Sequence, residues 1–311
     1  MKIVVFGPER RVGGLLGDRV VDLNLADPTL PASLERFIEG GDAALERAAR
    51  AVESAEASGA PLAPAASIGL RAPVVSRPRI ACAGGNYAVH LAGAMAANSG
   101  ADVSPEDVYR EMRAGTPWGF WKIADVAGPE EGVVYPGRAT RFDYEAELAV
   151  VIGRAGRDIP AARVRDHIWG VTLLNDWSIR NDMGPARVLN FNLAKNFDGS
   201  TSVGPCIVVG ENVDVQDVTV ELRVNDVVRQ SYCSRDMIFS FGELVEYLSR
   251  DFTFQPGDVI AAGTGPGTAM DTTRPAADGS IPPDRFLGVG DVVEVSSPTV
   301  GVLRNRVASK L

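Results

Sequence analysis

The sequence has few of the side chains that bind zinc or form disulfide bonds. Its 311 residues include three cysteines and two histidines. Cys82, Cys206 and Cys233 form no C-x-x-C pair, which argues against both a disulfide framework and a thiolate zinc site. With His90 and His167 as its two imidazoles, the chain is also poorly suited to a histidine zinc site. A metal ion bound here would need oxygen ligands, which favours Mg²⁺, Mn²⁺ or Ca²⁺.

Long apolar runs and an excess of positive charge are also absent. No apolar run reaches the roughly 20 residues that cross a bilayer. The chain has 31 basic and 40 acidic residues, for a net charge of −9. This balance repels phosphate groups, so we expect no nucleic-acid partner and no docking on anionic membranes. The first residues do not follow a signal-peptide pattern, so the expected location is the cytoplasm.

The composition of the chain changes at about residue 73. Residues 1–25 contain short β-like runs, and residues 30–58 have a helical composition. The following Ala/Pro-rich stretch, 59–73, is typical of a linker. We therefore predict a small N-terminal α+β domain with its linker over residues 1–73, and a larger domain over residues 74–311.

Short apolar runs separated by Gly, Pro, Asp and Asn dominate the larger part. Helical patterns are few and lie near 102–113, 160–167 and 241–250. The chain lacks the strand–helix alternation of a doubly wound sheet, so the sequence predicts a β-dominated α+β fold. The predicted strands include ELAVVIG, WGVTLL, PCIVVG, VTVELRVN, GDVIAAG, GDVVEVSS and GVLRNRV.

Two glutamates begin the most apolar of these runs. In FDYEAELAVVIG, Glu145 and Glu147 are two residues apart, so on a strand they share one face. Carboxylates that share a partly buried face repel each other unless a cation or a raised pKa relieves them. The alternative is a solvated strand face, which the apolar neighbours make less attractive.

A third carboxylate follows another predicted strand. Asp176 ends the run WGVTLLND, and its alternative role is an Asx turn or a helix N-cap. Together with Glu145 and Glu147 it offers three hard oxygen ligands from two strands, a set that suits an octahedral divalent ion.

Further candidate residues are less specific by themselves. His90 follows a Gly-Gly turn and is either a structural histidine or a base. Lys195 lies between apolar residues and is either a surface lysine or a stabiliser of a developing anion. The loop around Thr264, GTGPG, would allow backbone amides to approach a carboxylate. Neither a P-loop nor a dinucleotide fingerprint is present, so no nucleotide cofactor is expected.

Taken in order, these motifs resemble the fumarylacetoacetate hydrolase family, particularly its acylpyruvase-like and 2-hydroxyhepta-2,4-diene-1,7-dioate isomerase-like members. Each motif alone is weak, but eight in sequence from about residue 80 to 307 are specific. They are GGNYAVH, DYEAELAVVIG, LLNDWSIRND, LAKNFDGSTSVGPCIV, NDVVRQ, RDMIFSFGELVEYLS, QPGDVIAAGTGPG and GDVVEVSSPTVGVLRNRV.

The resemblance implies a mixed β-sandwich roll, a small preceding domain, and assembly as a homodimer. It also implies Mg²⁺ or Mn²⁺ held by Glu145, Glu147 and Asp176. The family acts on β-diketo or α-keto acids: its members hydrolyse acylpyruvates, decarboxylate oxaloacetate, or isomerise and decarboxylate catechol-cleavage products. We therefore expect metal-dependent hydrolysis of a carbon–carbon bond, as in aromatic catabolism, with a decarboxylase or isomerase as the alternative.

The resemblance also implies roles for other residues. It makes Lys195 a catalytic residue, and it assigns substrate contacts to Tyr87, Lys122 and Thr264. His90 corresponds to the general base that activates water for attack on the distal carbonyl.

Three features depart from the family pattern. Gly93 occupies the position of a glutamate that pairs with the histidine in many small hydrolases, which leaves open a member that binds a keto acid without turnover. The predicted lid at about 90–118 is long, and its Glu106, Asp107 or Glu111 is a candidate replacement acid. The third departure is an extended loop after Thr264, AMDTTRPAADGS, which predicts an altered substrate fit.

Two arginines are the remaining substrate-binding candidates. Arg180 and Arg187 flank the site strand and are candidates for binding a second carboxylate; surface salt bridges are the alternative.

Overall fold

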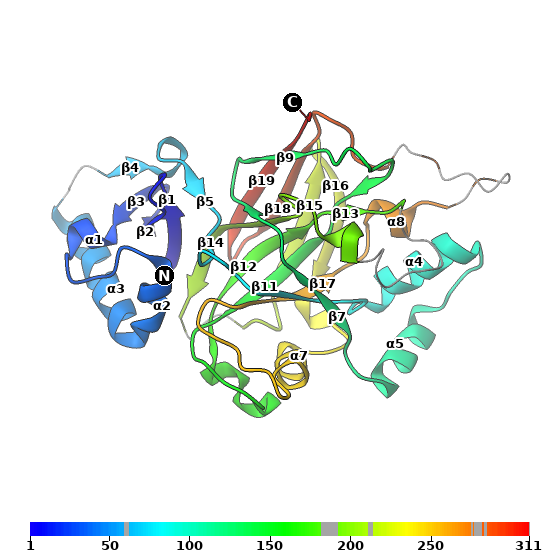
Figure 1. Ribbon diagram of the computed structural model, residues 1–311, viewed down its shortest axis with the longest axis horizontal. Helices are drawn as coiled ribbons and strands as arrows, with labels where there is room; N and C mark the ends of the chain where they lie inside the picture. Colours follow the sequence, from blue (N-terminus) through cyan, green and yellow to red (C-terminus); the bar gives the residue numbers. More distant parts are fainter. Residues whose placement is uncertain are drawn as a thin grey trace.

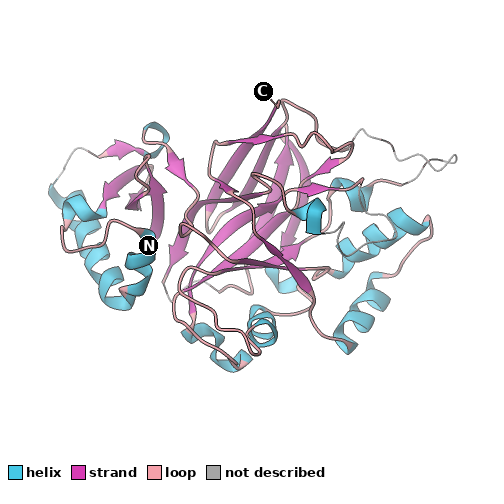
Figure 2. Cartoon of the chain, in the orientation of Figure 1, coloured by secondary structure: helices cyan, strands magenta, loops and turns pink. Residues whose placement is uncertain are grey.

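Strands dominate the computed structural model, which describes residues 1–58, 62–181, 192–210, 214–274, 276, 282 and 285–310. They fill the centre of the molecule, and the helices lie around them (Figure 2). The sheets are mixed and the helices few, so the predicted β-dominated α+β fold is confirmed.

The larger sheet joins the N-terminal strands to those of the main body. In the described residues it has 12 strands in the order β4-β3-β2-β1-β14-β12-β11-β17-β6-β7, with β5 beside β1 and β8 beside β14. The pairs β17–β6 and β14–β8 are parallel, whereas β11–β12 and β11–β17 are antiparallel. Its strands are β1 (Lys2–Phe6), β2 (Arg11–Leu16), β3 (Arg19–Asp22), β4 (Ala63–Pro64), β5 (Leu70–Arg71), β6 (Ile80–Ala83), β7 (Gly119–Lys122), β8 (Val126–Ala127), β11 (Ala146–Ile152), β12 (Ile168–Asp176), β14 (Thr201–Val209) and β17 (Val259–Thr264).

A second sheet packs against the first. Its order is β16-β15-β18-β19-β9, and a separate strand pair, β10–β13, lies next to the end of β12. The strands of the second sheet are β9 (Gly132–Val134), β15 (Thr219–Val224), β16 (Val227–Cys233), β18 (Val292–Ser297) and β19 (Gly301–Ala308). The separate pair is β10 (Phe142–Asp143) and β13 (Ser178–Ile179).

The helices lie at the edges of this strand core (Figure 1). Those of the N-terminal part cover its sheet, α4 and α5 lie together on the opposite side of the molecule, and α8 packs against α4. Their bounds are α1 (Leu23–Ala26), α2 (Leu34–Glu39), α3 (Gly41–Ser58), α4 (Ala88–Ser99), α5 (Pro105–Ala114), α7 (Phe241–Leu248) and α8 (Ala269–Thr272), with 3₁₀ turns η1 (Ala65–Ser67), η2 (Ala161–Asp166) and η3 (Ser234–Asp236).

Strand β11 is buried on both faces, which explains its continuous apolar run. Its alternate residues Leu148 and Val150 belong to the core cluster between the two sheets. Ala149 and Val151 face the other way, into a cluster that includes Phe37 from α2. The strand that carries Glu147 is therefore fixed by two cores at once.

The N-terminal part is joined to the rest by strand pairing as well as by packing. Ile3 of β1 pairs with Ile207 of β14, and the amino group of Met1 donates to the carbonyl of Val209 at 2.8 Å. The stretch expected to be a linker contains β4, η1 and β5. The division into domains 1–73 and 74–311 stays a prediction.

Helix α4 did not stand out in the sequence. It is rich in alanine and contains Gly93 and no acidic or lysine residue, so it lacks an amphipathic charge pattern. Small residues let it pack closely against α8, and it carries His90 into the core. Helices α4 and α5 make up most of the predicted lid, whose action as a lid stays a prediction.

None of the helices in the described part of the chain has the length and apolarity needed to span a membrane.

The second core cluster predicts a clear effect of one substitution. Phe37→Ala is expected to lower the free energy of unfolding by roughly 3–5 kcal/mol, because the ring is fully buried and meets Trp169 edge-on at 6.0 Å. Urea or thermal denaturation measures this. Leu25→Ala in nearby α1 is the control, since that side chain is 75% exposed, and it should change stability by less than about 0.5 kcal/mol. Equal effects of the two variants would contradict this view of the core.

Candidate active site

Three buried carboxylates meet where β11 and β12 pair. Glu145 directly precedes β11, Glu147 lies on it, and Asp176 ends β12. Oxygens of the three groups lie within 4.8 Å of one another. The backbone fixes this arrangement, because the amide of Asp176 donates to the carbonyl of Glu145 at 2.9 Å and the amide of Glu145 donates to Oδ1 of Asn175 at 2.9 Å. The predicted cluster of oxygen ligands is therefore formed.

Two buried lysines compensate part of this negative charge. Nζ of Lys195 donates to Oε2 of Glu145 at 2.6 Å, to Oδ2 of Asp176 at 2.8 Å and to Oγ of Ser178 at 2.7 Å. Nζ of Lys122 donates to Asp176 and, at 2.8 Å, to the carbonyl of Ser200. Both predicted lysines thus contact the carboxylate cluster directly.

The two glutamates differ in how well they are compensated. Burial raises the pKa of Glu147 well above its ordinary value, and the charges of Asp176 and Glu145 add to the rise. Burial also acts to raise the pKa of Glu145, but Lys195 and Arg180 outweigh it and hold that pKa below its ordinary value. The cluster therefore has room for more positive charge, and its oxygen donors fit a hard divalent cation such as Mg²⁺ or Mn²⁺.

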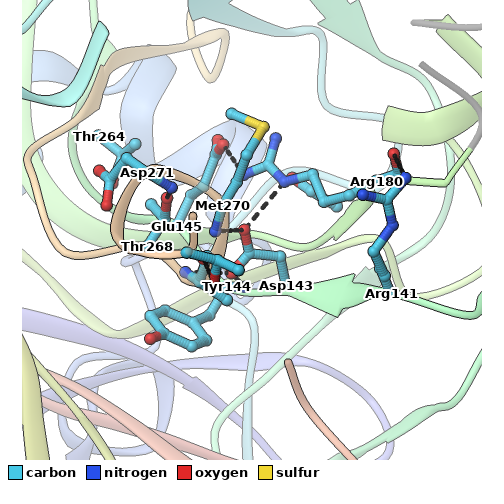
Figure 3. A network of polar contacts seen from close by, with 12 residues as sticks. Arg141, Asp143, Tyr144, Glu145, Arg180, Thr264, Thr268, Met270 and Asp271 are labelled. Carbon is cyan, nitrogen blue, oxygen red and sulfur yellow. Dashed lines mark hydrogen bonds and ion pairs between the residues drawn. The ribbon is translucent and has the colours of Figure 1, made fainter. Parts of the chain in front are cut away.

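Arg180 and a fourth buried carboxylate, Asp143, support the cluster (Figure 3). Arg180 donates to Glu145 and, through Nε at 2.9 Å, to Asp143. Asp143 also accepts the backbone amides of Ala269 at 2.8 Å and Met270 at 3.0 Å. It thereby ties the start of α8 to the cluster. Asp143 was missed in the sequence, although its place two residues before Glu145 was a signal.

His90 has an acidic partner. Its Nδ1 lies 2.7 Å from Oδ2 of Asp271, and both side chains are buried. The amide of Gly267 donates to both carboxylate oxygens of Asp271 at 3.1 Å, which fixes their orientation. The expectation that His90 lacks an orienting acid is therefore wrong: the acid comes from α8, in the loop whose length set this sequence apart.

Gly93 is the position that makes this contact possible. A Cβ atom there would lie 2.9 Å from both Cβ and the carbonyl oxygen of Asp271, closer than side chains tolerate. The absence of a glutamate at 93 and the presence of an aspartate at 271 thus belong together. Glu106 and Glu111 are exposed on α5, where Glu106 accepts from Ser104 at 3.0 Å and Asp107 pairs with Arg110.

The remaining predicted residues fall in three places. Thr264 lines the cavity described below, and its hydroxyl donates to the carbonyl of Ala146 at 2.8 Å. Tyr87 is buried, with its ring 4.9 Å from that of Tyr232, and is not among the described residues that line the cavity. Arg187 lies outside the described residues.

The turn GGN before α4 is built for close packing. Gly85 has φ of +61°, which a side chain would strain. Buried Asn86 donates to the carbonyls of Phe239 at 3.0 Å and Ala262 at 2.9 Å and accepts the amide of Phe239 at 2.8 Å. These bonds fix the start of the helix that carries His90.

One cavity of about 180 Å³ brings these groups together. Glu145, Arg180 and Lys195 form its charged floor, and His90 and Thr264 line it as well. One carboxylate of the cluster, a fixed lysine and the imidazole held by Asp271 therefore face one small space. Such a set can polarise an oxo acid and move a proton.

A family model matches the part of the chain that contains this site. The family described as fumarylacetoacetate (FAA) hydrolase, C-terminal, matches residues 79–308. The chain belongs to the fumarylacetoacetate hydrolase family. The predicted resemblance is thus confirmed, and the chain joins a family of enzymes.

Individual relatives differ in activity. The chain is 32% identical over 315 residues to human oxaloacetate tautomerase FAHD2B, mitochondrial, covering 99% of this chain and 91% of that protein. A fumarylacetoacetate hydrolase from Exiguobacterium antarcticum superposes with a TM-score of 0.77 at 27% identity, over the full length of both chains. Maleylpyruvate hydrolase from Sphingobium sp. SYK-6, in complex with manganese(II) ion and pyruvate, does so with a TM-score of 0.73 at 25% identity, again over both full chains.

The carboxylate cluster predicts metal binding that can be measured without turnover. Glu147→Gln is expected to weaken Mn²⁺ binding at least tenfold in calorimetry or electron paramagnetic resonance, because one of three charged ligands is lost. The control is Glu131→Gln, a half-buried glutamate paired with Arg71. Unchanged binding in the Glu147 variant would contradict this metal site.

Gly93→Ala tests the coupling to Asp271. Helix propensity alone would make alanine more stable by about 1 kcal/mol. We expect instead a net loss of about 1–2 kcal/mol in the free energy of unfolding, because the methyl group collides with Asp271. Gly115→Ala is the control, since beyond its chain neighbours its Cβ would come no closer than 3.6 Å, to the carbonyl oxygen of Met112. A rise in melting temperature for the Gly93 variant would show that the space is not restricted.

Proposed function

We propose that this protein hydrolyses a carbon–carbon bond in a β-diketo acid of the acylpyruvate type, with a divalent metal ion. The observation that carries the proposal is the His90–Asp271 contact beside the carboxylate cluster. A metal cluster alone serves many reactions, whereas a base held by its own acid beside that cluster suits activation of water.

Glu145, Glu147 and Asp176 would hold the ion, which we propose to be Mg²⁺ or Mn²⁺. When bound, it supplies Lewis-acid polarisation of the oxo groups and a positive field for developing negative charge. The ammonium group of Lys122 donates to both Asp176 and the carbonyl of Ser200, and these contacts hold the Asp176 side chain in place.

His90 acts on water. Its other ring nitrogen, Nε2, takes a proton from water while the water oxygen bonds to the distal carbonyl carbon. Asp271 holds the other nitrogen, Nδ1, and stabilises the imidazolium. The bond between that carbon and the methylene then breaks, and its electron pair passes to the methylene side. His90 returns the proton there, which gives pyruvate and a second carboxylic acid.

Lys195 and Arg180 act on charge rather than on protons. Burial acts to lower the pKa of Lys195, but Asp176 and Glu145 outweigh it and raise that pKa, so the group stays an ammonium at the cavity floor. It stabilises the negative charge that develops as the bond breaks. Arg180 keeps Glu145 oriented, and Thr264 lies where a substrate carboxylate would bind.

A second candidate is the interconversion of keto and enol forms of an oxo acid, as in the oxaloacetate tautomerases. It fits the name of the human relative that is 32% identical over nearly the full chain. His90 would then move a proton to or from carbon without activating water. A decarboxylase or dienedioate isomerase would use the same cluster, and the products separate all four reactions. A family member that binds a keto acid without turnover was suggested by the missing glutamate at position 93. Asp271 supplies an acid to His90 in place of that glutamate.

We also keep three broader expectations as proposals: a homodimer, a cytoplasmic location and a place in aromatic catabolism.

The test follows the near-ultraviolet enol absorbance of an acylpyruvate and identifies the products. Mg²⁺ or Mn²⁺ should be required, and pyruvate should form with a second acid. His90→Ala is expected to lower kcat by about 10²–10⁴-fold, and Asp271→Asn by a smaller but clear factor, because the imidazole loses its base role or its orientation. His167→Ala, the other histidine, should leave kcat unchanged.

Two outcomes would contradict this proposal. If cleavage persists after chelation and in the His90 variant, neither the metal ion nor this base is needed for the reaction. Solvent deuterium uptake without pyruvate release, lost in His90→Ala, would establish the tautomerase instead.

A further inference from the structure

The cavity has an apolar wall as well as its charged floor, and we infer that this wall selects substrates whose distal group is uncharged and apolar. The inference rests on the proposed function, because it names the part of the acylpyruvate that the wall would contact. The wall consists of Leu91 and Met95 from α4, Trp118 before β7, and Met270 from α8.

Trp118 is seated by the two glycines before α4. A Cβ atom at Gly84 would lie 2.4 Å from the indole ring, so only glycine lets the ring lie there. The amide of Gly84 donates to the carbonyl of Trp118 at 2.8 Å, which fixes the backbone of both residues. A Cβ at Gly85 would lie 3.1 Å from Leu91. The two glycines therefore leave the space that Trp118 and Leu91 of the wall occupy, in addition to forming the turn before α4.

Met270 connects the wall to the charged floor. Its amide donates to Asp143 at 3.0 Å, and its side chain lines the same cavity as Glu145. The next residue, Asp271, holds His90. One end of the substrate therefore lies at the carboxylates while the reacting carbonyl lies near His90, and the group beyond that carbonyl meets the wall.

The charges around the cavity argue against a second substrate carboxylate. Among the described lining residues, the cationic groups Arg180 and Lys195 are already bound to carboxylates, and His90 is held by Asp271. Among the described residues, a distal carboxylate would lie against apolar carbon and sulfur without a cation of its own, which is unfavourable. An alkyl or single-ring substituent would instead lose apolar surface to water, which favours binding. The volume of about 180 Å³ limits that substituent to a compact group.

A pair of substrates of matched length tests the wall. Butanoylpyruvate and succinylpyruvate differ in a terminal methyl against a carboxylate. We expect kcat/KM to favour butanoylpyruvate at least tenfold. From acetylpyruvate to butanoylpyruvate it should rise about fourfold for each methylene buried, and Trp118→Ala should flatten that rise.

Placing a cation in the wall should reverse the preference. Met95 is 42% exposed, so Met95→Lys can be accommodated, and it should shift the kcat/KM ratio at least tenfold toward succinylpyruvate. Val89→Lys is the matched control: it lies on the same helix, is 56% exposed, and lines a separate cavity. Its ratio should equal that of the unsubstituted protein.

The outcomes separate this inference from the proposed function. Hydrolysis with equal kcat/KM for the two substrates, or with a preference for succinylpyruvate, overturns the apolar wall and leaves hydrolysis intact. If neither compound is cleaved, the proposed function fails, and calorimetry of the Mn²⁺-loaded protein with the same two compounds decides the inference. Tighter binding of butanoylpyruvate, lost in Met95→Lys and kept in Val89→Lys, supports the wall; equal binding overturns it.

Discussion

Burying three carboxylates within 4.8 Å of one another is the constraint on which the rest of this structure depends. Unpaired, such charges would oppose folding strongly. Three buried cations offset part of this charge, because each forms an ion pair with a member of the cluster: Lys195, Lys122 and Arg180. Even so, burial and the nearby charges of Asp176 and Glu145 raise the pKa of Glu147. A site that still favours added positive charge is a site prepared for a cation.

The same charge compensation organises the chemistry around the cluster. Asp143 joins Arg180 to the start of α8, so the carboxylates help to place this short helix, together with its packing against α4. That helix then contributes Met270 to the apolar wall and Asp271 to His90. The proposed binding, proton transfer and substrate selection therefore share one network of contacts, and a substitution at Asp143 is expected to affect all three.

Much of this could be read from local pattern. The β-dominated fold followed from short apolar runs between turn residues, and β11, β12, β17 and β19 lie where those runs predicted strands. The cluster of Glu145, Glu147 and Asp176 followed from acids at the ends of apolar runs. Helix α4 was missed because its alanines and glycine carry no amphipathic pattern. Asp143 was missed although D-x-E-x-E marks a single strand face.

The sequence by itself determined which groups are available: oxygen ligands in place of thiolates and imidazoles, two buried strands that carry acids, and one histidine after a glycine turn. Only the tertiary structure decided which acid serves that histidine. Asp271 is 181 positions away from His90, and no spacing rule relates them. Their contact depends on the close packing of α4 against α8, which the missing side chain at Gly93 permits. Side chains from distant segments meet only when backbones pack, and packing is a property of the whole fold.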